Sequence, residues 1–156
     1  MALSLISLLT NFITKGVFAM LVKSFTGGVI FSGNKVLLRK NGDDWVLPRE
    51  ELHNGELPNE VALKKISQES GVQAEIVSNV GQTNYECFST TRQTPFLNKI
   101  TWYIMKSRND RVSEEKIKED SAFVNIDEAM NLMKYNQDKS LVNLSFMKYR
   151  EMEQLR

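Results

Sequence analysis

Residues 45–72, WVLPREELHNGELPNEVALKKISQESGV, hold the pattern that decides how the rest of the chain is read. The stretch begins with a short apolar segment, Trp45–Leu47, which Pro48 ends, and a charged loop follows. Pro58 suits the first turn of a helix, and Gly71 suits a left-handed C-terminal cap. The pattern therefore predicts a short strand, a loop and a helix over residues 57–70.

The predicted helix has an apolar face and a polar face. Val61, Ala62 and Ile66 form the apolar stripe. Lys65, Gln68 and Glu69 share the polar face, since they are spaced at i, i+3 and i+4. A loop that leads into one polar helix face is typical of an active site. The periodicity fits an ordinary surface helix equally well.

This stretch resembles the Nudix box, G-x5-E-x7-R-E-U-x-E-E-x-G-U with U aliphatic, which a W-x-L-P-like strand usually precedes. The matching positions are Trp45, Leu47, Pro48, Glu56, Ile66, Glu69, Gly71 and Val72. Four positions depart: Glu50 replaces the first Gly, Lys64 the Arg, Lys65 the next Glu, and Gln68 the first Glu of the final pair. The spacing is intact, but the chemistry of the box is changed.

The resemblance implies an α/β (α+β) Nudix fold, with a mixed β-sheet sandwiched between helices, over about residues 25–144. The remaining patterns agree with it. Strands are predicted at 25–31, 35–39, 74–80, 82–88, 98–105 and 123–125, and helices from 126 and over 141–152. With the box, the order is three strands, a helix, four strands and a C-terminal helical part.

In this family, box carboxylates hold Mg²⁺ or Mn²⁺ for the hydrolysis of a phosphoanhydride, because hard oxygen ligands suit these ions. This chain keeps Glu69, while Gln68 has an uncharged oxygen and Lys65 is a cation. The resemblance therefore predicts a metal site at Glu69 that is weak or absent, with Mg²⁺ or Mn²⁺ as cofactor only if the protein is active. Glu56 and Lys64 keep the charges of the family's Glu–Arg pair and are predicted to form a structural salt bridge.

The resemblance also suggests residues that contact a substrate. Arg39 and Lys40 end a predicted strand and either face phosphates or are ordinary surface charges. The full candidate set is Glu56, Lys65, Gln68 and Glu69 as catalytic residues, and Arg39, Lys40, Arg49, Lys64 and Tyr85 as substrate-binding residues. Trp102 is expected in the core instead, because Ile100 and Ile104 share its face.

The runs WVLP, TNY and TWYIM look most like bacterial diadenosine-polyphosphate hydrolases. Three functions remain open. The first is binding of a nucleoside or dinucleoside polyphosphate with weakened or lost hydrolysis. The second is an active Nudix hydrolase with relocated metal ligands, drawn from the spare acids Glu50, Glu51, Glu60, Glu115, Glu119 and Asp120. The third is a non-catalytic structural or interaction module.

Composition narrows the class of protein. The chain has 156 residues, of which 42% are hydrophobic, so one domain over residues 23–156 is expected. The net charge of +1 and the lack of a basic–aromatic patch argue against a nucleic-acid partner. The single cysteine, Cys87, cannot form an internal disulfide, which favours a cytoplasmic location. One histidine and one cysteine exclude a zinc cluster of those residues.

Residues 1–22 read as an amphipathic helical extension. Four polar residues at helical spacing lie opposite four apolar ones: Ser4, Ser7, Asn11 and Thr14 against Leu5, Ile6, Leu9 and Ile13. The pattern fits neither a signal peptide nor a membrane span. Packing on the domain or on a partner subunit, as in a homodimer, is favoured over contact with a membrane surface. Met20 is an alternative start of the biological chain.

Overall fold

The computed structural model describes residues 21–89, 94–108 and 118–155. These residues form a mixed α+β domain with one seven-stranded sheet. The elements are β1 (Leu21–Ser32), β2 (Lys35–Asn41), β3 (Asp44–Val46), β4 (Arg49–Glu51), α2 (Pro58–Ser70), β5 (Ala74–Ser89), β6 (Thr94–Ser107), β7 (Ser121–Asn125), α3 (Ile126–Leu132) and α4 (Asn136–Gln154).

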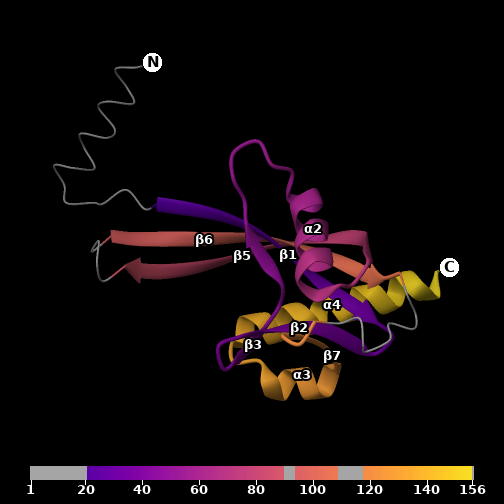
Figure 1. Cartoon of the computed structure of the whole chain (residues 1–156). Coiled ribbons are helices and arrows are strands. Elements are labelled where there is room, and N and C mark those ends of the chain that lie inside the picture. Colours follow the sequence, from indigo (N-terminus) through magenta and orange to yellow (C-terminus); the bar gives the residue numbers. More distant parts are fainter. Residues whose placement is uncertain (1–20, 90–93, 109–117, 156) are drawn as a thin grey trace.

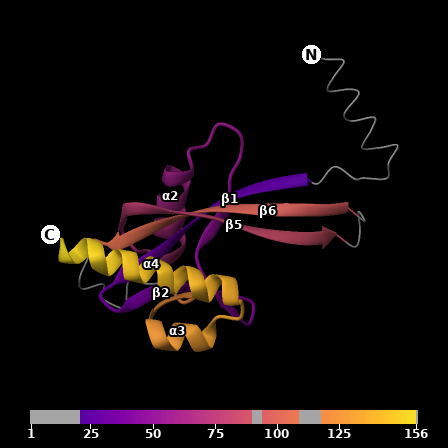
Figure 2. The same cartoon turned by 180° about the vertical axis from the view of Figure 1, so that it is seen from behind.

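The sheet runs in the order β3-β2-β1-β6-β5, with β4 paired to β1 and β7 paired to β2. The β1–β6 pair is parallel and the other pairs are antiparallel. Figures 1 and 2 show α2 and α4 on opposite sides of this sheet. The expected mixed sheet between helices is therefore confirmed.

The alternation of side chains along the strands builds two hydrophobic clusters, one on each face. Ile30 of β1 packs with Ala62 and Ile66 of α2, whereas Phe31 packs with Val142 and Tyr149 of α4, among others. Successive side chains of a strand point to opposite sides, so one face of the sheet packs against α2 and the other against α4 and α3, which contributes Ala129.

Trp102 lies in the core, as its neighbours on β6 predicted. Its side chain is 1% exposed, and its indole N–H donates to Thr83 Oγ1 at 2.7 Å. A Cβ on Gly27 would lie 2.5 Å from the Trp102 ring and 2.7 Å from the Pro48 carbonyl oxygen. Glycine at this position therefore lets β1 approach both the tryptophan and the chain that enters β4.

Helix α2 confirms the prediction made from the box. It begins at Pro58 and is capped by Gly71, whose φ of 77° is left-handed and whose N–H donates to the Ser67 carbonyl. Thr26 of β1 donates its hydroxyl to the Pro58 carbonyl at 2.8 Å and so attaches the start of the helix to the sheet. Within the predicted apolar stripe, Ala62 and Ile66 are buried. Val61 is only half-buried.

Several boundaries differ from those expected, among them the start of β6, which lies at Thr94 rather than 98. Residues 74–80 and 82–88 form the single strand β5, because bulges around Val77 and Val80 let it bend without ending. Residues 49–51, expected in a loop, pair with β1 as β4.

Helix α4 begins at Asn136 rather than 141. Strand β1 begins at Leu21, inside the range assigned to the extension, and residues 1–20 lie outside the described part of the chain. None of the described helices is long and apolar enough to cross a membrane.

Candidate functional site

The polar face of α2 meets β2 and β4 in a chain of ion pairs. Lys65 Nζ lies 2.5 Å from Glu50 Oε2 and also pairs with the Glu69 carboxylate. Arg39, from β2, pairs with the second oxygen of Glu69. We call Arg39, Glu69, Lys65 and Glu50 the ion-pair network. Two cations and two carboxylates make its formal charge zero.

Lys65 is the most enclosed member of the network. Its side chain is 17% exposed, against 27% for Glu69 and 36% for Glu50. Burial lowers the pKa of Lys65, but the hydrogen bonds and charges of Glu50 and Glu69 outweigh burial and raise it above its ordinary value. Lys65 therefore remains an ammonium ion at neutral pH.

This arrangement does not fit the divalent metal that the box resemblance implies. Among residues 21–89, 94–108 and 118–155, no three His, Cys, Asp or Glu side chains gather as a metal site would require. Glu69, the carboxylate that this chain keeps among box positions 65, 68 and 69, is bound by two cationic side chains. A magnesium ion needs several oxygens at close range, and here a positive side chain lies among them.

Glu56 has a partner other than the expected Lys64. It accepts a hydrogen bond from the backbone N–H of His53 at 2.7 Å, and its carboxylate lies 3.0 Å from His53 Nδ1. A turn in which the Glu56 N–H donates to the His53 carbonyl folds the two residues together. The pKa of Glu56 is lowered, first by that backbone N–H. The Glu56–Lys64 salt bridge is thus not formed in the described structure.

A groove of about 190 Å³ runs beside the box helix. We call it the box groove, and its lining residues are Glu50, Glu51, His53, Glu56, Val61, Lys64, Lys65 and Gln68. It brings together three of the four predicted catalytic residues. Glu69 lies beside it through its ion pair with Lys65.

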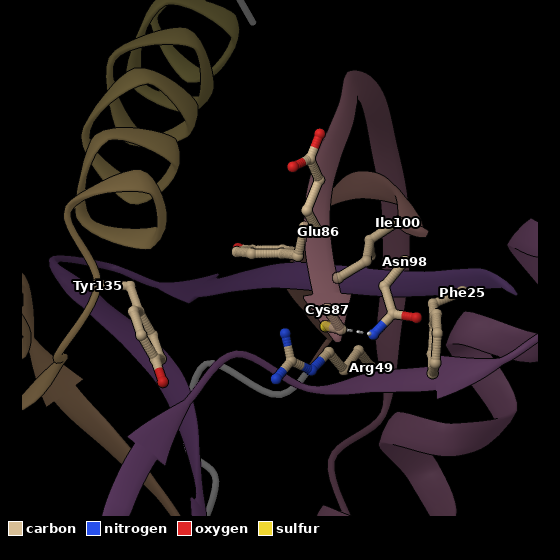
Figure 3. Close-up of a pocket in the computed structure, with 8 residues that line it drawn as sticks. Phe25, Arg49, Glu86, Cys87, Asn98, Ile100 and Tyr135 are labelled. Carbon is tan, nitrogen blue, oxygen red and sulfur yellow. Dashed lines mark hydrogen bonds between the residues drawn. The ribbon is translucent and has the colours of Figure 1, made fainter. Parts of the chain in front are cut away.

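A larger cavity of about 380 Å³ lies nearby, and we call it the aromatic cavity. Its lining residues are Phe25, Arg49, Tyr85, Glu86, Cys87, Asn98, Ile100 and Tyr135 (Figure 3). The Arg49 guanidinium lies 5.9 Å from the centre of the Tyr85 ring, within the range of a cation–π contact. Asn98 donates to Cys87 Sγ at 3.6 Å, as the dashed line in Figure 3 marks.

Tyr85 connects the aromatic cavity to α4. Its hydroxyl donates to the carboxylate of Asp138, a side chain that is 4% exposed. Burial, followed by this contact with Asp138, raises the pKa of Tyr85 far above its ordinary value. Tyr85 is therefore a neutral, oriented ring in the wall of the cavity.

Strand β4 contributes residues to both hollows. At its first residue, Arg49, the strand lines the aromatic cavity, and at its next two residues, Glu50 and Glu51, it lines the box groove. The predicted substrate-binding residues are divided accordingly. Arg49 and Tyr85 line the cavity, Lys64 lines the groove, and Arg39 is bound to Glu69. Lys40 is exposed and outside both hollows, with its Nζ 6.0 Å from the Trp45 ring centre.

The sequence did not single out several residues of the site. The ion pair between Glu50 and Lys65 could have been predicted from the sequence, because both residues replace a box residue and their charges are opposite. No sequence pattern indicated that Asp138 and Tyr135 belong to the site, because they lie at the beginning of α4, far along the chain from β5. Among the spare acids, Glu115 lies outside the described residues, and Glu119 and Asp120 are exposed.

No family model matches the sequence. Solved structures do match the fold: an Ap4A hydrolase from C. elegans is 17% identical, with 83% of this chain and 98% of that chain covered and a TM-score of 0.62. The E. coli dihydroneopterin triphosphate pyrophosphohydrolase is 15% identical, with coverage of 80% and 96% and a TM-score of 0.61. A Nudix hydrolase from Nitrosomonas europaea is 15% identical, with coverage of 81% and 88% and a TM-score of 0.54. Together with the box spacing, these similarities show that the chain has the Nudix fold.

Proposed function

We propose that this protein binds a nucleoside or dinucleoside polyphosphate and hydrolyses it weakly or not at all. The observation that carries the proposal is the distribution of uncommitted cations. Arg49 and Lys64 form no ion pair with any described residue, and they line the two hollows that meet at β4. A ligand with a planar base and a phosphate chain suits this pair of hollows.

The aromatic cavity suits the base. Its volume falls within the range of small-molecule pockets, and Phe25, Tyr85 and Tyr135 offer ring faces for stacking. Arg49 can bind a phosphate oxygen through two N–H groups at once. The mouth of the cavity therefore provides both stacking and charge.

The box groove suits the phosphate chain less strongly. Lys64 is exposed and can pair with a phosphate as a point charge. Glu51 and Glu56 lie in the same groove and repel a polyanion. We expect the aromatic cavity and Arg49 to supply most of the binding energy.

Hydrolysis of a phosphoanhydride needs positive charge that stabilises the oxygens of the transition state and positions the attacking water. In this protein, both oxygens of Glu69 are held by cationic side chains, and Gln68 has no charge to offer a metal. We therefore expect a turnover with Mg²⁺ well below about 1 per second, a value within the ordinary range for enzymes.

The test is binding of ATP and of diadenosine tetraphosphate by calorimetry, in EDTA and again with Mg²⁺. Both ligands should bind in EDTA, and Arg49→Ala should weaken binding by about tenfold, or 1.4 kcal/mol. Lys40→Ala is the matched control, because it removes an exposed cation outside both hollows, and it should change affinity little.

The other two functions predict different results. An active hydrolase with relocated ligands would release product at ordinary rates only when Mg²⁺ is present. An interaction module would show no ligand-induced rise in melting temperature. The homodimer, the cytoplasmic location and the packing of residues 1–22 remain predictions from the sequence.

A further inference from the structure

Two residues that depart from the Nudix box contact each other. Glu50 replaces the first glycine of the signature and Lys65 replaces a glutamate, and the structure places Lys65 Nζ 2.5 Å from Glu50 Oε2. The same ammonium also pairs with Glu69. Lys65 thus places a cation beside Glu69, and Glu50 supplies that cation with a second carboxylate.

The position of Lys65 is that of a cation bound between two acidic ligands. Its side chain is less exposed than either carboxylate, and its pKa is raised by both of them. A divalent ion bound to Glu50 and Glu69 would have to occupy the same space as this ammonium. Because the ammonium of Lys65 is part of the chain, its binding to Glu50 and Glu69 requires neither a free metal ion nor the removal of that ion's water shell.

We propose that Lys65 takes the place of a divalent cation, and that Glu50 and Glu69 form a latent metal site that Lys65 masks. The ligand set is particular to this chain, because the box has glycine where this chain has Glu50. The inference concerns metal binding alone and does not depend on whether a nucleotide binds.

Replacing Lys65 by glutamate should expose the latent site. The ion-pair network would change from two cations and two carboxylates to one cation and three carboxylates, so its formal charge would fall from zero to −2. The carboxylates at 50, 65 and 69 would then point to one region, with the Gln68 amide oxygen next to Glu69 in sequence. Three or more oxygens in one place are what Mn²⁺ and Mg²⁺ require.

The probe is Mn²⁺ alone, with free Mn²⁺ followed by electron paramagnetic resonance and heat by calorimetry. The native protein should bind no Mn²⁺ at concentrations up to about 1 mM, a weak-affinity limit. Lys65→Glu should bind at least about tenfold more tightly than the native protein. The matched control is Lys40→Glu, which makes the same change in charge at an exposed position outside the network and should leave Mn²⁺ binding unchanged.

The contribution of Glu50 separates this site from a simple restoration of the box. In the Lys65→Glu protein, Glu50→Gln should weaken Mn²⁺ binding by about tenfold or more, as loss of a charged ligand does. Glu51→Gln is its control, since Glu51 is the next residue of β4 and makes no ion pair with a described residue. Equal losses from the two substitutions would contradict the assignment of Glu50.

Lys65→Gln provides a second test of the proposal if the Lys65→Glu protein does not fold. It removes the ammonium without adding a carboxylate, so it should bind Mn²⁺ more tightly than the native protein and melt at a higher temperature when Mn²⁺ is added. Micromolar binding of Mn²⁺ by the native protein would overturn the proposal. Failure of both Lys65 variants to exceed Lys40→Glu would overturn it as well.

Discussion

The box groove and the aromatic cavity are both lined by residues of β4, and they differ in whether their charged side chains are paired within the protein. In the groove, Lys65 and Glu69 are committed to each other and to Glu50 and Arg39. In the cavity, Arg49 faces an aromatic ring and has no carboxylate partner among the described residues. The charges of Lys65 and Glu69 are thus neutralised within the protein, whereas that of Arg49 is paired with no described carboxylate.

The largest expected effect on stability comes from removing Lys65, the cation at the centre of the ion-pair network. Lys65→Met should lower the free energy of unfolding by about 1–3 kcal/mol, because Glu50 and Glu69 would then face each other without the ammonium between them. Because Lys65 and Glu50 are partly exposed, the loss of stability should be smaller than for a fully buried ion pair. Urea denaturation of the native protein and of Lys65→Met measures the difference in the free energy of unfolding.

Lys64→Met is the control for this change, because Lys64 is the next residue of α2 and is exposed. Its effect should stay within about 0.5 kcal/mol. Equal effects of the two substitutions would mean that the network does not stabilise the fold.

A smaller effect is expected in the aromatic cavity. Tyr85→Phe keeps the ring but leaves the buried Asp138 carboxylate without the hydroxyl that donates to it. The free energy of unfolding should fall by about 1–2 kcal/mol, the usual cost of a buried polar group that loses its partner. Tyr135→Phe, at a ring that is 47% exposed, should cost much less in the same denaturation experiment.

Nucleotide binding provides a second measurement on the Tyr85→Phe protein. If the ring stacks on a base, ATP affinity should change less than stability does, because the stacking surface is retained. A complete loss of ATP binding with an intact fold would show that the hydroxyl itself contacts the ligand.

The smallest effect concerns pH. Association with Glu50 and Glu69 raises the pKa of Lys65 above its ordinary value of 10.5, so the ammonium is favoured in the folded state. Its contribution to stability is therefore complete below pH 10.5 and is lost as pH rises through the folded-state pKa. The difference in melting temperature between the native protein and Lys65→Met should shrink above pH 10.5. A constant difference across this range would contradict the predicted shift.

The sequence by itself determined the elements whose signals are local. Pro58 and Gly71 set the ends of α2, and the alternation of Ile100, Trp102 and Ile104 placed Trp102 in the core. Such signals work because a helix or strand repeats at a fixed period, and burial of one face leaves that period in the sequence. The gap-free spacing of the box likewise predicted the fold that the solved structures share.

The tertiary structure alone decided which charged and polar groups meet. Glu56 turns to His53 rather than Lys64 because a tight local turn brings them together. Tyr85 reaches Asp138 across 53 positions of the chain because β5 and the start of α4 become neighbours in the fold. Pairing depends on which elements the sheet places side by side, and no periodicity within one element records that arrangement. The sequence therefore predicted a site at the box helix, and the fold decided which of its charges are already bound.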